Sequence, residues 1–110
     1  DYWAVSTKEL INKINFNEDL LKKDDVKIAF CGVAFNNVET YLKKINNFKF
    51  QKVNYLTDKF DYIIMTNRAA YDDQSNLTNV QTCFDKFNGK DIIKVKRRGL
   101  VLSTIRENIK

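Results

Sequence analysis

The residues of this chain that could carry out catalysis are few. The sequence contains no His, so it cannot form a Ser-His or Cys-His pair and offers no imidazole ligand to a metal. Its two cysteines, Cys31 and Cys83, lie too far apart in the sequence to match the ligand spacing of a zinc site. The usual acid–base and metal chemistry of small enzymes is therefore not indicated by these residue types.

Cys31 is the one residue whose position suggests a nucleophile. It ends an apolar segment and precedes an expected helix, as the thiolate of a phosphatase does. That chemistry also needs a phosphate-binding loop closed by an Arg, and position 37 is Asn. We predict that Cys31 and Cys83 are buried, free structural thiols. They would pair only in an oxidising compartment and only if their Cα atoms come within reach.

Acidic pairs and glycines do not indicate a strong site either. The pairs Asp24-Asp25 and Asp72-Asp73 are typical of solvated loops, with a cation site at Asp72-Asp73 as the alternative. Segment 31–35 has a single Gly where a dinucleotide-binding loop needs three. We therefore predict no catalytic residue, no metal site and no cofactor for this chain by itself.

A dense group of cations lies near the carboxyl end of the sequence. The net charge is +5, although the abundance of Lys and Asn explains that charge at least as well as a polyanionic partner does. We interpret the group as the solvated side of an edge hairpin or, alternatively, as a contact for lipid phosphate, polyprenyl phosphate or nucleic acid. This group, called the basic run below, consists of Lys94, Lys96, Arg97 and Arg98.

Two aromatic residues near the start of the chain are candidate anchors. Tyr2 and Trp3 either pack on a sheet or sit at a membrane interface, a layer that aromatic side chains favour. The sequence starts at Asp1 without a Met and runs at once into an expected helix. This start predicts a domain excised from a longer protein.

Hydrophobic periodicity predicts the elements that position these residues. Ser6 opens a Ser-x-x-Glu capping box, which predicts a helix that begins there. Segments 26–31, 50–56 and 61–66 have the composition of strands. The apolar spacing after Asn36 predicts a helix between the first two strands, with Asn36 as its N-cap. Strand, helix and strand in this order predict a βαβ unit with parallel strands.

The end of the chain is predicted to form an antiparallel hairpin. Segments 92–97 and 100–105 flank Arg98-Gly99, which reads as a two-residue turn. The lysines of the first strand should then point outward, as an exposed edge requires. The inner pairs of this register are Val95 with Leu102 and Ile93 with Thr104. The outward pairs are Lys94 with Ser103 and Lys96 with Val101.

These elements together predict one α/β domain over residues 1–110. We expect a βαβ unit in a mixed sheet of about five strands, a C-terminal antiparallel hairpin and two to three helices, one of them short and within 78–87. The helix after Asn36 should bury one apolar stripe against the sheet. The stripe consists of Val38, Leu42 and Ile45, and its expected partners are Ile28, Phe30, Ile63 and Met65.

Several short motifs, in the same order along the chain, resemble a family of membrane enzymes. They are Asp1-Tyr2-Trp3-Ala4-Val5-Ser6, Phe60-Asp61-Tyr62-Ile63-Ile64 with Thr66-Asn67-Arg68, and the Gly-centred terminal hairpin. They resemble the C-terminal extracytoplasmic soluble domain of polytopic glycosyltransferases, of the protein-mannosyltransferase-like and aminoarabinose-transferase-like kind, which use polyprenyl-phosphate sugars. Ala4 stands where that family usually has Gly.

The resemblance implies a membrane-tethered appendage on the periplasmic or extracellular side. The family's catalytic acid lies in a loop between membrane helices, and no residue here matches it. The full-length parent would thus be the glycosyltransferase, and this domain would be its non-catalytic accessory part. The implied partners are the transmembrane part of the same polypeptide and anionic lipid or polyprenyl phosphate. The alternative is a small basic binding module for nucleic acid or another polyanion, with nucleic acid the less favoured partner.

Overall fold

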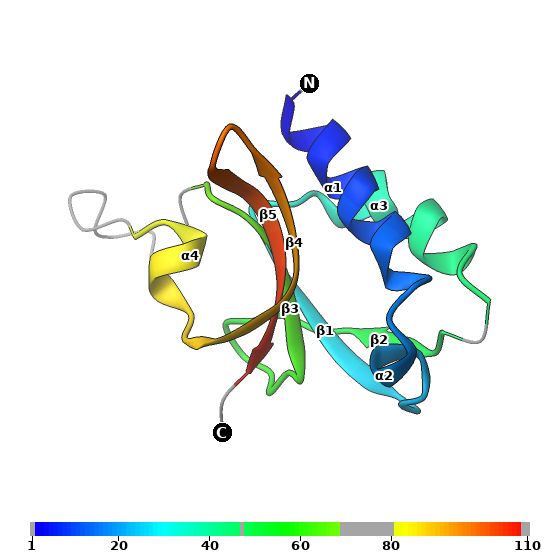
Figure 1. Cartoon of the computed structure of the whole chain (residues 1–110). Helices are drawn as coiled ribbons and strands as arrows, with labels where there is room; N and C mark the ends of the chain where they lie inside the picture. Colours follow the sequence, from blue (N-terminus) through cyan, green and yellow to red (C-terminus); the bar gives the residue numbers. More distant parts are fainter. Residues whose placement is uncertain (1, 47, 69–80, 109–110) are drawn as a thin grey trace.

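The computed structural model describes residues 2–46, 48–68 and 81–108, and for residues 2–5 it describes the backbone alone. Within these ranges the chain forms an α/β structure with one five-stranded sheet (Figure 1). The helices are α1 (Tyr2–Ile14), α2 (Glu18–Leu21), α3 (Phe35–Lys43) and α4 (Cys83–Lys86). The strands are β1 (Val26–Cys31), β2 (Phe50–Lys52), β3 (Tyr62–Thr66), β4 (Gly89–Arg97) and β5 (Leu100–Asn108).

The sheet is mixed, with the strand order β2-β1-β3-β5-β4. Strand β1 pairs in parallel with β2 and with β3, and β5 pairs antiparallel with both β3 and β4. The predicted fold class, the βαβ unit β1-α3-β2 and the C-terminal hairpin are therefore confirmed. Strand β4, which carries most of the basic run, lies at one edge of the sheet.

Helix α1 begins earlier than predicted. It starts at Tyr2, so Ser6 lies inside the helix and the predicted capping box is wrong. Ser6 is buried, and its backbone carbonyl accepts a hydrogen bond from the Oγ of Ser103 on β5 at 3.2 Å. A small residue at this position allows the helix to lie close to the strand. The Ser-x-x-Glu pattern here reflects that contact and a surface ion pair instead of a helix start.

Two other predicted boundaries also shift. Helix α3 begins at Phe35, with Ala34 and not Asn36 as its N-cap, and the ring of Phe35 packs edge-on against Phe30 at 5.1 Å between centroids. Strand β2 ends at Lys52 instead of position 56. After it, the backbone N–H of Asn54 donates to the carboxylate of Asp58, which closes a turn. Local side-chain bonding of this kind competes with strand pairing.

Helices α1 and α3 cover one face of the sheet (Figure 1). The stripe of Val38, Leu42 and Ile45 is buried there, as predicted. Two of its expected partners, Ile28 and Phe30, belong to the same face, together with Ile64, which was not predicted. Ile63 and Met65 were expected as partners but lie on the opposite face, because alternate residues of a strand point to opposite sides. All five residues of β3 are buried, as expected for a strand covered on both faces.

The opposite face is covered by α4 and by segment 53–60. Its central feature is a disulfide between Cys31 at the end of β1 and Cys83 at the start of α4, with the Cα atoms 5.9 Å apart. Our prediction of free thiols is therefore wrong. The sequence could not show that α4 folds back over β1 and brings the two cysteines within bonding reach. Positions 78–82 of the expected short helix fall partly outside the described residues, and α4 itself begins at Cys83.

The hairpin turn is where it was predicted, but the register is shifted. Two β-bulges or similar irregularities interrupt the pairing, one near Leu102 and one near Ile92. Of the predicted pairs only Lys96 with Val101 is confirmed. The observed pairs are Val95 with Ser103, Ile93 with Ile105 and Lys94 with Thr104. The shift places Ser103 beneath α1 and Ile105 opposite Ile93 in the core, and such an extra residue cannot be read from alternation alone.

Candidate anion-contacting site

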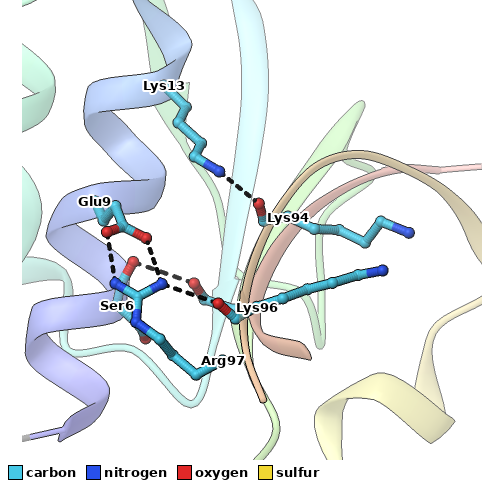
Figure 2. A network of polar contacts seen from close by, with 7 residues as sticks. Ser6, Glu9, Lys13, Lys94, Lys96 and Arg97 are labelled. Carbon is cyan, nitrogen blue, oxygen red and sulfur yellow. Dashed lines mark hydrogen bonds and ion pairs between the residues drawn. The ribbon is translucent and has the colours of Figure 1, made fainter. Parts of the chain in front are cut away.

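The structure divides the basic run into two parts with different surroundings. Lys94, Lys96 and Arg97 belong to β4, and Arg98 lies in the turn that follows. Alternation along the strand sends the side chains of Lys94 and Lys96 to the sheet face opposite α1, whereas Arg97 points toward that helix (Figure 2). The four cations therefore do not form one continuous patch.

Arg97 is engaged in holding the hairpin against α1. Its two terminal nitrogens donate to the carboxylate of Glu9 at 2.6 and 3.1 Å, a bidentate ion pair (Figure 2). One of them also donates to the carbonyl of Lys96 at 2.9 Å. The hydrogen bond from Arg97 is the largest cause that lowers the pKa of Glu9 below its ordinary value. Arg97 thus has a structural contact and is the weakest candidate for binding a ligand.

Lys94 and Lys96 remain exposed on the outer side of the hairpin. Their backbone carbonyls are used, since Lys94 accepts from the ammonium of Lys13 at 3.1 Å and Lys96 accepts from Arg97. Their side chains point away from these contacts (Figure 2). These two carbonyls of β4 are thus bonded to α1 and to Arg97, while the side chains of Lys94 and Lys96 stay exposed.

The turn presents a cation and an apolar residue side by side. Arg98 and Gly99 have φ values of 52° and 82°, the positive values that a two-residue type I′ hairpin turn requires. Arg98 is exposed, and Leu100, directly after the turn, is 69% exposed. We call Lys94, Lys96 and Arg98 the hairpin cations. Leu100 was predicted only as a strand residue. It is exposed because it is the first residue of β5 and lies next to the turn, where the core no longer covers the strand.

The candidate anchors Tyr2 and Trp3 lie in the first turn of α1. Their side chains are outside the described residues, so neither interpretation of them is decided. The amino end of α1 and the β4–β5 turn lie at the same end of the molecule (Figure 1). The bonds from Arg97 to Glu9 and from Ser103 to Ser6 tie the two elements together there.

The other chemical candidates from the sequence have structural surroundings. Cys31 is buried and bonded to Cys83, so in this state it has no thiolate to act as a nucleophile. Gly32 has a φ of 72°, and its carbonyl accepts from the Oγ1 of Thr66 at 2.6 Å. A Cβ at Gly32 would lie 2.6 Å from the Oγ1 of Thr66. This close approach explains why the position is Gly, and no bound phosphate is needed to account for it. The pair Asp72-Asp73 lies outside the described residues, among which no acidic or Cys cluster could hold a metal.

A polar depression lies at the amino ends of β1 and β3. It has a volume of about 580 Å³, and its lining includes Lys23, Asp61, Tyr62 and Glu107. Hydrogen bonding with Tyr62 is the largest cause that raises the pKa of Lys23, and Glu107 and Asp61 add to it electrostatically. The ammonium of Lys23 is 5.5 Å from the centre of the Tyr62 ring. These groups satisfy one another, which favours a structural role over ligand binding.

A smaller aromatic groove lies at the carboxyl ends of β1 and β2. It has a volume of about 300 Å³, and Phe30, Phe35 and Tyr55 contribute to its lining. Burial raises the pKa of Tyr55. The ammonium of Lys52 lies 5.1 Å from the centre of the Phe35 ring. This groove was not predicted, because its aromatic residues come from three separate parts of the chain: β1, α3 and the segment that follows β2.

Comparison with known proteins adds no identification. No protein-family profile, curated protein or solved structure matches this chain. Among the described residues, no helix is both long enough and apolar enough to cross a bilayer.

Proposed function

We propose that this chain is a non-catalytic accessory domain of a membrane-embedded glycosyltransferase that uses polyprenyl-phosphate-linked sugars. In this proposal the domain faces the periplasm or the cell exterior and is tethered to the transmembrane part of the same polypeptide. The observation that carries the location is the disulfide between Cys31 and Cys83. Structural disulfides form and persist in exported proteins and are rare where thiol reductants are abundant.

The place of the disulfide in the fold supports this reading. Both cysteines are buried in the core, between the sheet and α4. The bond closes a loop across a sequence separation of 52 residues, which includes β2, α3 and β3. A cross-link of this span contributes substantially to stability in a small domain. We therefore interpret it as a permanent feature of a protein that folds in an oxidising compartment.

The motifs behind the family resemblance have structural positions in this fold. Asp61 precedes the central strand β3, and its carboxylate accepts from the backbone N–H of Lys27 at 2.9 Å. The carbonyl of Phe60 accepts from the side-chain amide of Asn108, at the end of β5. These contacts fix the start of β3 to its neighbours. These motif residues therefore have structural roles. Structural roles are what we expect of motif residues in a non-catalytic domain, and in this sense the contacts support the proposal.

The proposed work of the domain is to contact the membrane or the lipid-linked donor beside the embedded active site. The hairpin cations are the groups best placed for this role, because their charged ends are exposed at one edge of the sheet. Phosphates of a lipid or of a polyprenyl carrier would supply the complementary charge. Cations held near an anionic surface are attracted to it and are screened by salt.

A topology experiment tests the proposal. The reading frame that encodes the chain should continue upstream of Asp1 into a polytopic hydrophobic sequence. In cells, alkaline phosphatase fused after Lys110 should be active, since that enzyme needs export, while a fluorescent reporter that folds only in the cytosol should be dark. A soluble upstream sequence, or the opposite pattern of reporters, would contradict the proposal. A fusion to a cytosolic loop of the same protein serves as the control.

A further inference from the structure

Exposed apolar side chains on this molecule differ in their neighbours. Among the described residues, the large and strongly exposed ones are Phe16 at 87%, Leu100 at 69% and Leu56 at 51%. Phe16 lies between two Asn residues after α1, and Leu56 lies in the turn closed by Asp58. Leu100 alone follows directly on a cationic turn and pairs with a basic residue of β4. A single exposed Leu is ordinary, but one set among cations has the character of a surface for lipid.

The hairpin end is held rigidly where it projects. Arg97 makes its bidentate pair with Glu9, and Ser103 donates to Ser6, so both strands are tied to α1 next to the turn. Both residues of the turn have the positive φ values that a tight type I′ hairpin requires. A surface that is already ordered loses little conformational entropy when it binds. Arg97 thus fixes the tip, and the other three cations remain exposed.

We propose that the β4–β5 turn is a membrane-contacting tip, in which Leu100 enters the interfacial layer while the hairpin cations bind phosphates of anionic lipid head groups. This inference deepens the proposed function and rests on its membrane-tethered location. It assigns different roles within the basic run: Lys94, Lys96 and Arg98 bind lipid, and Arg97 positions the tip.

The geometry favours a lipid surface over nucleic acid. The sequence of β4, the turn and β5 contains no aromatic residue, so these elements offer no ring on which bases could stack. Transfer of an exposed Leu from water to the interfacial layer is favourable, because apolar surface leaves water. A phosphate backbone offers that side chain no equivalent apolar partner. The amino end of α1 lies at the same end as the turn (Figure 1). A tether preceding α1 would therefore hold this tip near the bilayer.

Co-sedimentation of the 110-residue chain with vesicles tests the proposal. One vesicle set is pure phosphatidylcholine, and the other contains phosphatidylglycerol in addition. The unmodified chain should bind the anionic vesicles, with an affinity that falls steeply with salt. Lys94→Gln, Lys96→Gln and Arg98→Gln together should lower the partition coefficient about a hundredfold, since each cation near the surface changes it about fivefold. Leu100→Asn should lower it a few-fold and leave the salt dependence unchanged.

A matched control separates the tip from net charge. Lys22, Lys49 and Lys59 are exposed and precede β1, β2 and β3, at the end of the sheet remote from the turn. Changing these three to Gln removes the same charge and should leave most of the binding intact. Equal losses in the two triple variants, or no loss in either, would overturn the proposal. Unchanged binding by Leu100→Asn would likewise contradict the proposed insertion of the Leu100 side chain into the interfacial layer.

A nucleic-acid binding assay and a control for folding complete the test. Binding of single-stranded oligonucleotide that exceeds vesicle binding, and that is lost in the hairpin triple variant, would overturn the lipid assignment in favour of a polyanion-binding module. Thermal unfolding of every variant shows whether the fold is retained, and these exposed positions should leave it unchanged. The vesicle assay does not depend on cellular location. A negative result in the vesicle assay would therefore contradict only the membrane-contacting tip. A negative result with the reporter fusions would contradict the proposed function.

Discussion

On the side of the sheet covered by α1 and α3, aliphatic packing dominates, whereas on the side of α4 a disulfide and an Arg-centred network take its place. The first face has a cluster of fifteen buried residues and the second a cluster of six, counted among the described residues. The smaller cluster cannot rely on burial alone, because hydrophobic stabilisation scales with the apolar area removed from water. The comparison shows one sheet stabilised by two different means.

Arg106 is the polar counterpart of the disulfide on the second face. Its Nε donates to Asp91 at 2.6 Å, and its Nη1 donates to the carbonyls of Phe84 at 2.8 Å and Phe87 at 2.5 Å. The guanidinium also lies 5.7 Å from the centre of the Phe84 ring. One side chain on β5 therefore satisfies the carboxyl end of α4. The disulfide fixes the other end of that helix at Cys83.

Removal of the disulfide should have the largest effect on stability. Replacing Cys31 and Cys83 together with Ala should lower the free energy of unfolding by about 4 kcal/mol, because the unfolded chain regains the freedom of a long loop. Urea unfolding of the double variant against the oxidised protein measures this difference. The reduced unmodified protein is the matched control and should lose a similar amount. A loss below about 1 kcal/mol would show that the second face does not need its cross-link.

Truncation in the aliphatic face should cost slightly less. Leu42 is fully buried, and Leu42→Ala should lower the free energy of unfolding by about 3 kcal/mol through lost burial and a residual cavity. The neighbouring exposed residue Lys43 provides the control, since Lys43→Ala should change stability by less than about 0.5 kcal/mol. Equal effects at the two positions would mean that the apolar face of α3 is assigned incorrectly.

Removal of the Arg106 network should have an intermediate effect. Arg106→Met keeps most of the side-chain stem but leaves Asp91 and two carbonyls without their donor, which should cost about 2 kcal/mol. Arg98→Met, at the exposed turn, is the matched control and should be nearly neutral. Hydrogen exchange would locate the change: amides of α4 should lose protection while those of α3 keep it. Protection lost equally in both helices would contradict the local role of Arg106.

The Glu9–Arg97 pair should have the smallest effect, and it depends on pH. Because Arg97 lowers the pKa of Glu9 in the folded state, the pair contributes stability above the ordinary pKa of the carboxyl. That contribution is lost as pH falls through the lowered folded-state pKa. Both side chains are more than a third exposed, so solvent screening keeps the effect below about 1 kcal/mol.

Unfolding curves of Glu9→Gln measure the size of this pair. They should differ from those of the unmodified chain near neutral pH and converge with them in acid or in high salt. A difference that persists undiminished in acid would show that the contact acts through packing. Lys8→Gln, a neighbouring change on the same helix, should show neither the pH dependence nor the convergence.

The sequence predicted the aliphatic face better than the cross-linked one. The stripe of Val38 and Leu42 follows from helical periodicity, and strand β3 follows from its strand-like composition; a sequence displays both directly. The disulfide joins residues from separate elements, which local patterns cannot bring together. The register of β4 and β5 depends on bulges that the alternation of side chains does not predict. The start of α1 was missed for a similar reason, since the burial of Ser6 depends on β5.

The sequence showed which residues make up the candidate site, but not how the structure divides them. The basic run is visible in the sequence, yet its division depends on Glu9, 88 positions away from Arg97. Alternation along β4 predicted that Lys94 and Lys96 point outward, but it could not show that Arg97 pairs with α1. The exposure of Leu100 could not have been predicted, because it follows from where the core ends and not from the pattern of the strand.

Thiol trapping tests most directly whether this protein resides in an oxidising compartment. Cells that produce the protein are quenched in acid, denatured and treated with a maleimide, before and after reduction. We expect no label before reduction and two labels after it, as counted by mass spectrometry of the purified chain. A Cys31→Ser and Cys83→Ser double variant should take up no label in either case. Two labels on the unreduced chain would contradict the account.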